Sequence, residues 1–147
     1  MKAVVQVVNN ANLKVNGKMI SQIGKGFVVY FCVEKGDKEE LLDYFAKKIS
    51  NLRVFVDEND KMNLSVKDVG GEILLVSQFT LAGDCEHGNR PSFIEAEIPD
   101  RANSFYEKLC KKIEVEYSIK VSRGVFGADM KITQENNGPV TIIINIK

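Results

Sequence analysis

Phe27-Val28-Val29-Tyr30-Phe31-Cys32-Val33-Glu34 is the stretch of sequence that most constrains the fold. It is nearly all apolar, short, and rich in aromatic and β-branched residues, which is typical of a strand buried on both faces. Before it, Asn16-Gly17 separates Leu13–Val15 from Lys18–Ile20 and predicts a two-residue hairpin, because both residues tolerate positive φ. The valines within residues 4–8 favour a strand ahead of that hairpin. The chain is therefore expected to open with three strands.

Two amphipathic helices are expected to follow. The first is predicted to begin near Asp37, with Glu40 three residues on as in a capping box. Its apolar residues at helical spacing are Leu41, Leu42, Phe45, Ile49 and Leu52. The second is predicted after Pro99-Asp100, and its apolar face would consist of Ala102, Phe105, Tyr106, Leu109, Cys110 and Ile113.

Further strands are expected around these helices. Arg53–Val56 reads as a short strand, and Ile73–Val76 as a buried strand that runs directly into Ser77. Val115, Tyr117, Ile119 and Val121 alternate with polar residues and predict a strand with one buried face. Near the end, strands are expected at Met130–Thr133 and Val140–Ile146, with a turn at Glu135–Pro139 between them.

This order of elements is not a repeating alternation of strand and helix. It favours an α+β fold in which a mixed, mostly antiparallel sheet curls into a barrel-like shape against two main helices. A length of 147 residues fits one domain over residues 1–147. No glycine-rich nucleotide-binding motif follows any expected strand.

Composition narrows the class of protein. Hydrophobic residues make up 44% of the chain, which excludes a disordered protein. The apolar runs are far shorter than the roughly 20 residues that a membrane helix needs, and residues 1–6 lack the layout of a signal peptide. A cytoplasmic protein without membrane association is expected. Lys plus Arg and Asp plus Glu both total 20, so charge alone does not suggest an RNA partner.

A conventional search for catalytic side chains finds little. Three scattered cysteines and the single His87 make a zinc site improbable, and we expect neither a metal nor a cofactor. Cys85 lies two residues from His87, but both fall in a glycine-rich loop and no third group is present to orient the histidine. Ser77-Gln78-Phe79-Thr80-Leu81 is more promising, because polar side chains at the end of a rigid strand can face a pocket. A plain strand end with satisfied hydroxyls is the alternative for that segment, and a plain tight turn is the alternative for Asn136–Pro139.

At these two segments the chain resembles the D-aminoacyl-tRNA deacylase family. The family's S-Q-x-T-L motif appears as Ser77–Leu81 and its N-x-G-P-V-T motif as Asn136–Thr141. Supporting stretches, in chain order, are Asn51-Leu52-Arg53, Lys61-Met62-Asn63-Leu64-Ser65, Asn89-Arg90-Pro91-Ser92-Phe93 and Phe126-Gly127-Ala128-Asp129-Met130. The resemblance covers essentially the whole length.

The resemblance implies a homodimer that hydrolyses the ester of D-aminoacyl-tRNA and also removes glycine from mischarged tRNA. It implies that Gly138-Pro139 is a cis peptide that reaches into the partner subunit's pocket, together with Asn137. The backbone carbonyls of this loop would exclude side chains that project in the L direction. Met130 and Phe93 are assigned to the substrate site by the same resemblance, with Phe93 as a wall for the terminal adenosine.

The implied mechanism uses hydrogen-bond donors more than reactive side chains. Backbone N–H groups around Phe79 and Thr80 would stabilise the developing oxyanion, with Ser77 and Gln78 beside them. The ribose 2′-OH of the substrate would help to orient water. Thr80 is interpreted as a positioning group, and the rival interpretation is that Thr80 acts as a covalent nucleophile.

The sequence departs from the family pattern at two positions. Val7 stands where the family usually has an arginine that braces the Gly-Pro loop, and Cys32 stands where glycine is common. Because of Val7, an editing hydrolase of relaxed specificity, which also accepts some L-amino acids, is an open alternative. A non-catalytic RNA- or protein-binding module of the same fold is a second alternative, against which the two intact motifs argue.

Overall fold

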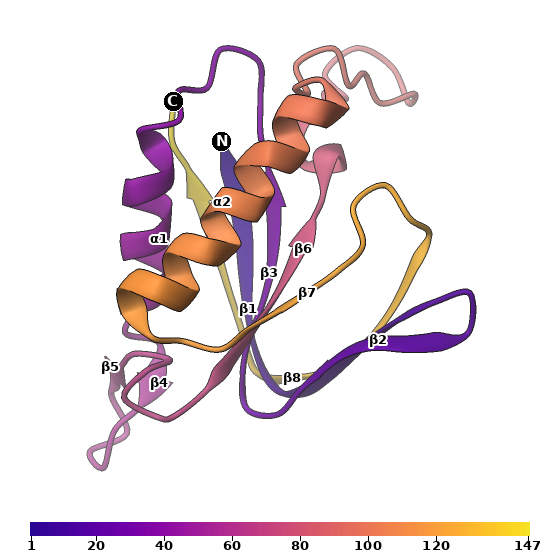
Figure 1. Cartoon of the computed structure of the whole chain (residues 1–147). Coiled ribbons are helices and arrows are strands. Elements are labelled where there is room, and N and C mark those ends of the chain that lie inside the picture. Colours follow the sequence, from indigo (N-terminus) through magenta and orange to yellow (C-terminus); the bar gives the residue numbers. More distant parts are fainter.

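The computed structural model describes the whole chain, residues 1–147, and its central element is a six-stranded mixed sheet (Figure 1). The strand order is β2-β1-β3-β6-β7, and β8 pairs with the other edge of β1. The bounds are β1 Lys2–Val15, β2 Lys18–Ile23, β3 Gly26–Cys32, β6 Glu72–Ser77, β7 Val121–Arg123 and β8 Met130–Asn145. The three pairs made by β1 are antiparallel, whereas β3-β6 and β6-β7 are parallel.

The long strand β1 shapes the sheet. Its first half pairs with β3 and its second half with β2, while β8 follows it along the opposite edge. Figure 1 shows β1, β2 and β8 bending away from the part of the sheet that the helices cover, so that the sheet nearly closes on itself. The α+β, barrel-like fold predicted from the sequence is confirmed. The predicted hairpin is confirmed as well, with Asn16 at φ 50° and Gly17 at φ 75°.

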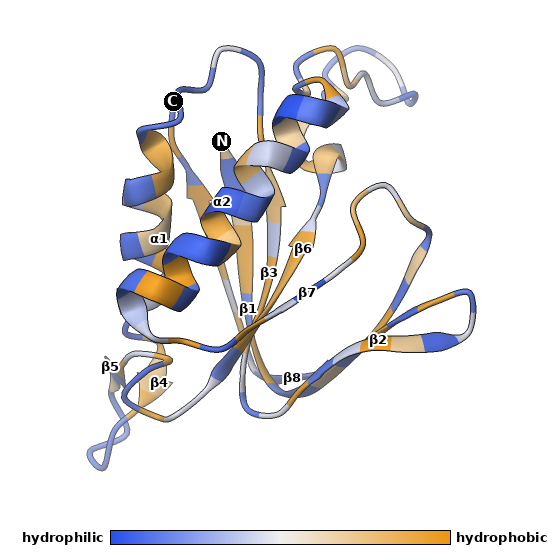
Figure 2. Cartoon of the chain, in the orientation of Figure 1, coloured by the Kyte–Doolittle hydropathy of each residue, from blue (hydrophilic) through white to orange (hydrophobic).

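Two helices cover one face of the sheet. Helix α1 (Leu41–Asn51) and helix α2 (Pro99–Tyr117) lie side by side there, and Figure 2 shows hydrophobic and hydrophilic residues alternating along both. Most of the buried residues of the two helices are apolar. This face contributes to a cluster of 25 buried residues, whereas the bent part of the sheet encloses a second cluster of seven. Neither helix combines the length and apolarity needed to cross a membrane. A separate hairpin joins β4 (Phe55–Val56) to β5 (Met62–Leu64).

The predicted start of α1 is wrong. The helix begins at Leu41, and its N-cap residue Glu40 makes no side-chain capping bond. The Asp37 carboxylate instead accepts a hydrogen bond from Glu34 N (2.7 Å) and pairs with the Met1 ammonium (2.6 Å). The Asp37 carboxylate, which the local sequence pattern predicts as a helix cap, therefore forms an ion pair with the chain's N-terminus instead.

The predicted strand over residues 115–121 is also wrong. Helix α2 continues through Tyr117 and ends at Ser118, which adopts a left-handed conformation with φ 54°. Only Val121–Arg123 is a strand, and Val115 is exposed on the helix. A short alternation of apolar and polar residues also fits the end of an amphipathic helix, so the alternation over these residues does not distinguish a strand from a helix.

The third correction concerns Glu135–Pro139, which is not a hairpin turn between two strands. Strand β8 runs through this segment without reversing direction and stays antiparallel to β1 on both sides of it. Gln6 pairs with Thr141 and Val8 with Asn136, so residues 137–140 lie opposite Val7 alone. The segment is a large bulge with four residues opposite one, and a bulge is one of the few places where a sheet accepts proline.

Candidate active site

Strand β6 delivers the Ser77–Leu81 segment from the centre of the core. Its residues 73–76 are buried, and it lies between β3 and β7. The parallel ladder extends one residue past the strand, because Gln78 N donates to Phe31 O at 2.8 Å. The segment therefore begins on a rigid support.

A short 3-10 helix, η1 (Phe79–Ala82), follows immediately. Its first hydrogen bond runs from Leu81 N to Gln78 O (3.3 Å), and the bond at its C-cap runs from Gly83 N to Thr80 O (3.0 Å). The N–H groups of Phe79 and Thr80 come before the first of these bonds and so have no partner inside the helix. They are two adjacent donors next to the pocket described below.

The Thr80 hydroxyl is held by an amide. Gln78 Nε2 donates to Thr80 Oγ1 at 2.5 Å, and no histidine, lysine or carboxylate side chain contacts that oxygen. A nucleophilic hydroxyl requires a base within hydrogen-bond reach. The contacts of Thr80 fit a positioning group better than a nucleophile.

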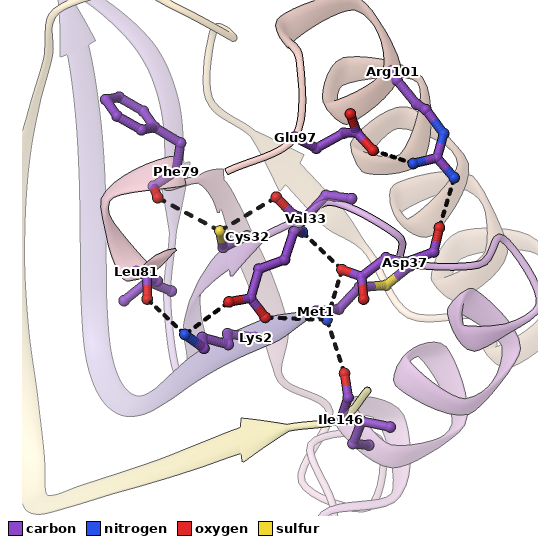
Figure 3. Close-up of polar contacts among 11 residues, drawn as sticks. Met1, Lys2, Cys32, Val33, Asp37, Phe79, Leu81, Glu97, Arg101 and Ile146 are labelled. Atoms are coloured by element: carbon purple, nitrogen blue, oxygen red, sulfur yellow. Dashed lines mark hydrogen bonds and ion pairs between the residues drawn. The ribbon is translucent and has the colours of Figure 1, made fainter. Parts of the chain in front are cut away.

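An ionic cluster supports η1 from below (Figure 3). Lys2 Nζ donates to Leu81 O (3.3 Å) and pairs with Glu34 Oε1 (2.8 Å). Burial on its own would raise the pKa of the Glu34 carboxyl, but the hydrogen bond and charge of Lys2 outweigh burial and lower that pKa. The Met1 ammonium lies in the same cluster and donates to Ile146 O at 2.8 Å. The Leu81 carbonyl of η1 is thus tied to β1 by a charged donor.

A mostly apolar pocket of about 510 Å³ opens beside η1, and its size is in the usual range for small-molecule sites. Its walls are the ends of β3 and β6, the first turns of α2 and the segment that enters β8. The lining residues are Phe31, Cys32, Val33, Val76, Ser77, Gln78, Phe79, Ala96, Glu97, Pro99, Ala102, Tyr106, Phe126, Gly127, Ala128, Met130 and Ile132.

Three ionisable side chains line this pocket, and none is poised to act as a base. Burial raises the pKa of the Cys32 thiol to about 11, and burial also raises the pKa of the Tyr106 hydroxyl. A hydrogen bond from Ile98 N, assisted by Arg101, lowers the pKa of the Glu97 carboxyl. The thiol and the phenol therefore stay protonated at neutral pH, and the carboxylate is a weak proton acceptor.

Two aromatic rings stand at the edge of the site. Phe79 is 57% exposed and meets Phe93 edge to face, with ring centroids 5.2 Å apart. Gly83 allows this approach, because a Cβ there would lie 3.0 Å from Phe93 Cε1. The structure therefore brings Phe93 beside Phe79 at the edge of the site.

The predicted site residues thus fall into two groups. Ser77, Gln78, Phe79 and Met130 line the pocket, and Thr80 and Phe93 adjoin them. Asn137, Gly138 and Pro139 do not line it. Their bulge lies opposite Val7, which pairs with Phe27 of β3, and Phe27 in turn pairs with Ile73 of β6. The Phe31–Ser77 pair at the pocket lies four residues further along the same two strands. Four residues correspond to about 13 Å between the bulge and the pocket, measured along the strands.

The bulge itself is exposed, and its Gly138–Pro139 peptide is cis. Gly138 has φ +122°, and a Cβ there would lie 2.7 Å from Val140 Cγ2. Val7 lies opposite the bulge but is only 4% exposed and packs into the large core cluster. An arginine-like brace from position 7 is therefore absent.

The rejected Cys–His pair lies elsewhere. Cys85 and His87 are both exposed in the loop that a bridge between Asp84 and Ser92 closes, and no hydrogen bond joins them. The chain contains no group of three or more His, Cys, Asp or Glu side chains arranged to hold a metal ion.

Comparison with known proteins identifies the family. The family model described as D-Tyr-tRNA(Tyr) deacylase matches residues 4–145. The chain belongs to this family. A relative from Thermosipho melanesiensis named D-aminoacyl-tRNA deacylase is 52% identical over 147 residues, which are 100% of this chain and 98% of the relative. A relative of the same name from Thermodesulfovibrio yellowstonii is 47% identical over 147 residues, which are 100% of this chain and 100% of the relative. The family recognised from the sequence, and the prediction of a hydrolase, are confirmed.

Solved structures agree on the fold. A structure titled c-Myc DNA Unwinding Element Binding Protein is 39% identical, with a TM-score of 0.92 over 100% of this chain and 99% of that chain. A second, titled as a probable eukaryotic D-amino acid tRNA deacylase, has a TM-score of 0.83 over 99% of this chain and 98% of that one. At 19% identity the second supports the fold alone.

Sequence reasoning missed part of the pocket wall. The sequence predicts Ala102 and Tyr106 as residues of the apolar face of α2, which is correct for the buried Tyr106, but it predicts no pocket role for them and no function for Glu97. Helical periodicity marks which face is buried, but it does not distinguish a core from the lining of a pocket. The stretch Phe126–Met130 did carry a signal, because it matched the family and now lines the site.

Proposed function

We propose that the protein hydrolyses the ester bond between a D-amino acid, or glycine, and the terminal adenosine of tRNA, and that it excludes L-aminoacyl-tRNA. The observation that carries the proposal is the pair of unpartnered N–H groups of Phe79 and Thr80, beside an apolar pocket whose ionisable side chains are poor bases. Family membership supplies the substrate class, because relatives about 50% identical are named D-aminoacyl-tRNA deacylase.

The proposed chemistry relies on stabilising the transition state. Aminoacyl esters are already labile, so the main task is to hold the ester and to bind the oxyanion that forms as water attacks. Two backbone donors on a rigid strand end suit that task, and a donor of this kind is worth about 2.7–4 kcal/mol in related sites. The apolar pocket and the exposed Phe79–Phe93 pair would receive the adenosine. The substrate's own 2′-OH would orient the water.

Thr80→Ala tests the role of the hydroxyl. We expect kcat/KM for D-tyrosyl-tRNA to stay within about tenfold of the parent, because the backbone donor survives the substitution. Ser118→Ala, an exposed residue at the end of α2, serves as the control. A loss of a thousandfold or more in Thr80→Ala would reverse the assignment and make Thr80 the nucleophile.

L-exclusion is proposed to come from Asn137, Gly138 and Pro139 of a second copy of the chain. Three facts support a contribution in trans: the bulge does not line its own pocket, it is exposed, and the outer edge of β8 pairs with no strand. An unpaired edge of 16 residues is a surface that proteins usually cover. A chain that is monomeric at micromolar concentration would contradict this part of the proposal.

A mixed dimer tests the contribution in trans directly. One subunit carries Ala102→Trp, which fills the pocket but leaves the bulge intact, and the other carries Gly138→Ala, which disturbs only the bulge. In the mixed dimer the single open pocket would face the intact bulge and should reject L-tyrosyl-tRNA. Leakage per open pocket equal to that of the Gly138→Ala homodimer would place L-exclusion within one subunit.

Two other functions have an observation behind them. The buried Val7 favours relaxed specificity, which equal cleavage of D- and L-tyrosyl-tRNA would demonstrate. The 39% identical structure titled as a DNA-element binding protein favours a nucleic-acid-binding module. Cleavage of neither tyrosyl-tRNA enantiomer nor glycyl-tRNA would support the module. We further propose that residues 1–147 act as one cytoplasmic domain with no membrane partner.

A further inference from the structure

The bulge in β8, residues 137–140, has no backbone pairing with β1. Regular pairing with β1 stops at Thr141 on one side and resumes at Asn136 on the other, with Val7 alone between them. A second register shift follows at once, because Val8 pairs with Asn136 and Asn10 with Glu135. The ladder therefore holds the two ends of the bulge at Gln6 and Val8 of β1, but it gives residues 137–140 no pairing partner of their own.

A chain of side-chain hydrogen bonds spans this gap. Gln6 Nε2 donates to Thr141 Oγ1 on the far side of the bulge (3.3 Å), and Gln6 Oε1 accepts from Gln134 Nε2 on the near side (2.9 Å). Gln134 Nε2 also donates to Asn136 Oδ1 (2.5 Å), and Gln134 Oε1 accepts from the Tyr30 hydroxyl (2.9 Å). One amide thus bridges both ends of the bulge, and a second ties the bridge to β3.

The second register shift is held in the same manner. Glu135 Oε2 accepts from Asn9 Nδ2 (3.0 Å) and from Asn10 Nδ2 (3.3 Å), which fixes the extra residue in β1. Val7 and Val8 are buried and carry no polar group. In this chain, amides therefore occupy the place of a charged brace at position 7.

The bridge is built from groups that keep one protonation state. Amides do not titrate, and burial raises the pKa of the Tyr30 hydroxyl, so Tyr30 remains a donor through the neutral and mildly alkaline range. The bonds from Gln134 to Gln6 and from Tyr30 to Gln134 are partly buried, which shields them in part from competition with water, whereas the bonds to Thr141 and Asn136 are exposed. Such a brace would hold the bulge equally well at pH 6 and pH 9.

We propose that Gln6, Gln134 and Tyr30 are positioning residues that brace the two ends of the Gly138–Pro139 bulge, and that this brace determines the strictness of L-exclusion. This inference rests on the proposed function, because it assigns a cause to the selectivity proposed above. None of the three residues lines the pocket. They should therefore change the ratio of D to L cleavage and leave D cleavage itself nearly intact.

The test measures kcat/KM for D-tyrosyl-tRNA and L-tyrosyl-tRNA with the full chain. In Gln134→Leu and Gln6→Leu we expect D cleavage within about threefold of the parent and L cleavage at least tenfold higher. Tyr30→Phe removes one oxygen and is the variant least able to disturb folding, and it should shift the ratio in the same direction. Gln22→Leu is the matched control, because Gln22 is exposed on β2 and its side chain makes no hydrogen bond.

A conservative variant separates positioning from general stability. The carboxylate introduced by Gln6→Glu can accept both from Gln134 and from the Thr141 hydroxyl, so this variant should keep the parent's D to L ratio. A merely structural role would lower thermal stability without moving that ratio. The inference is overturned if the parent rejects L-tyrosyl-tRNA and Gln134→Leu and Tyr30→Phe reject it equally well. Failure of the parent to discriminate at all would instead refute the proposed function.

Discussion

The Ser77–Leu81 and Asn136–Thr141 segments belong to one proposed site, yet the fold supports them in opposite ways. Ser77–Leu81 ends a central strand with both neighbours in place, and its donors are backbone groups. Asn136–Thr141 lies on an edge strand, is exposed, and is held by side-chain amides. Groups that stabilise a transition state need rigidity from the core, whereas a segment that serves a second subunit must remain on the surface.

This comparison has consequences for substitutions. A change beneath the first segment should reduce stability strongly, because it opens a cavity in a packed core. A change in the second should alter selectivity with little loss of stability, unless it affects a backbone conformation that only glycine adopts. The following experiments, in order of expected effect, test that difference.

Leu75→Ala should have the largest effect. Leu75 is fully buried in β6, and its carbonyl accepts from the Tyr106 hydroxyl (2.8 Å) and from Gly124 N (3.2 Å). Loss of the side chain should lower the free energy of unfolding by about 2–5 kcal/mol, measured by urea denaturation. Ile143→Ala on β8, where the side chain is 73% exposed, should change it by less than about 0.5 kcal/mol. Equal losses would mean that both segments depend on the core alike.

Gly138→Ala should be the exception within the second segment. With φ at +122° and Val140 Cγ2 within 2.7 Å of the new Cβ, the substitution strains the backbone and should lower stability by about 1–3 kcal/mol. Thermal unfolding measures the loss. Gly24→Ala is the control, because a Cβ at Gly24 meets only Glu72 Oε2, at 3.9 Å. An unchanged unfolding temperature in Gly138→Ala would show that the bulge adapts freely.

Glu34→Gln tests the ionic support of η1 through its pH dependence. The pKa of Glu34 is lowered in the folded protein, so its contribution to stability is present above the pKa of an unfolded glutamate and is lost as pH falls through the folded value. The parent should be more stable than the variant at pH 7, and the difference should vanish towards pH 3. Urea midpoints at several pH values measure it. A difference that stays constant with pH would remove Glu34 from the support.

The smallest effect is expected from thiol modification. Burial raises the pKa of Cys32 to about 11 and that of Cys110 to about 12, whereas Cys85 is exposed. One equivalent of an alkylating reagent should therefore react with the native protein at pH 8, and three after denaturation. Deacylation should be unaffected, because Cys85 lies outside the pocket. Rapid labelling of Cys32 would mean that the Ser77–Leu81 segment moves away from β3 often enough to expose the buried thiol beneath it.

The sequence predicted the class of fold and the first segment well, for local reasons. Asn16-Gly17 specifies its own turn, and an eight-residue apolar run has few alternatives to a buried strand. Ser77 follows such a run directly, so its place at a strand end could be read without knowledge of the partners.

The errors arose wherever a distant partner outweighed a local pattern. Asp37 has the sequence spacing of a helix N-cap, but its carboxylate pairs with the Met1 ammonium. Glu135–Pro139 has the composition of a turn, but pairing with β1 on both sides keeps β8 running as one strand. Tyr106 is not an error, because it is buried in the core as its spacing predicts, but only the arrangement of β6, α2 and β8 makes it part of a pocket wall as well.

The sequence by itself thus determined the family, the strand-rich α+β class and the residues of both motifs, because these depend on short-range preference and on the order of residues. The tertiary structure alone decided that the two motifs lie about 13 Å apart along the strands, since register, bulges and curvature are set by pairing between distant segments. It also decided that a bridge of two amides and one hydroxyl, from three strands, spans the Gly138–Pro139 bulge, because Gln6, Tyr30 and Gln134 are neighbours only once the sheet has formed.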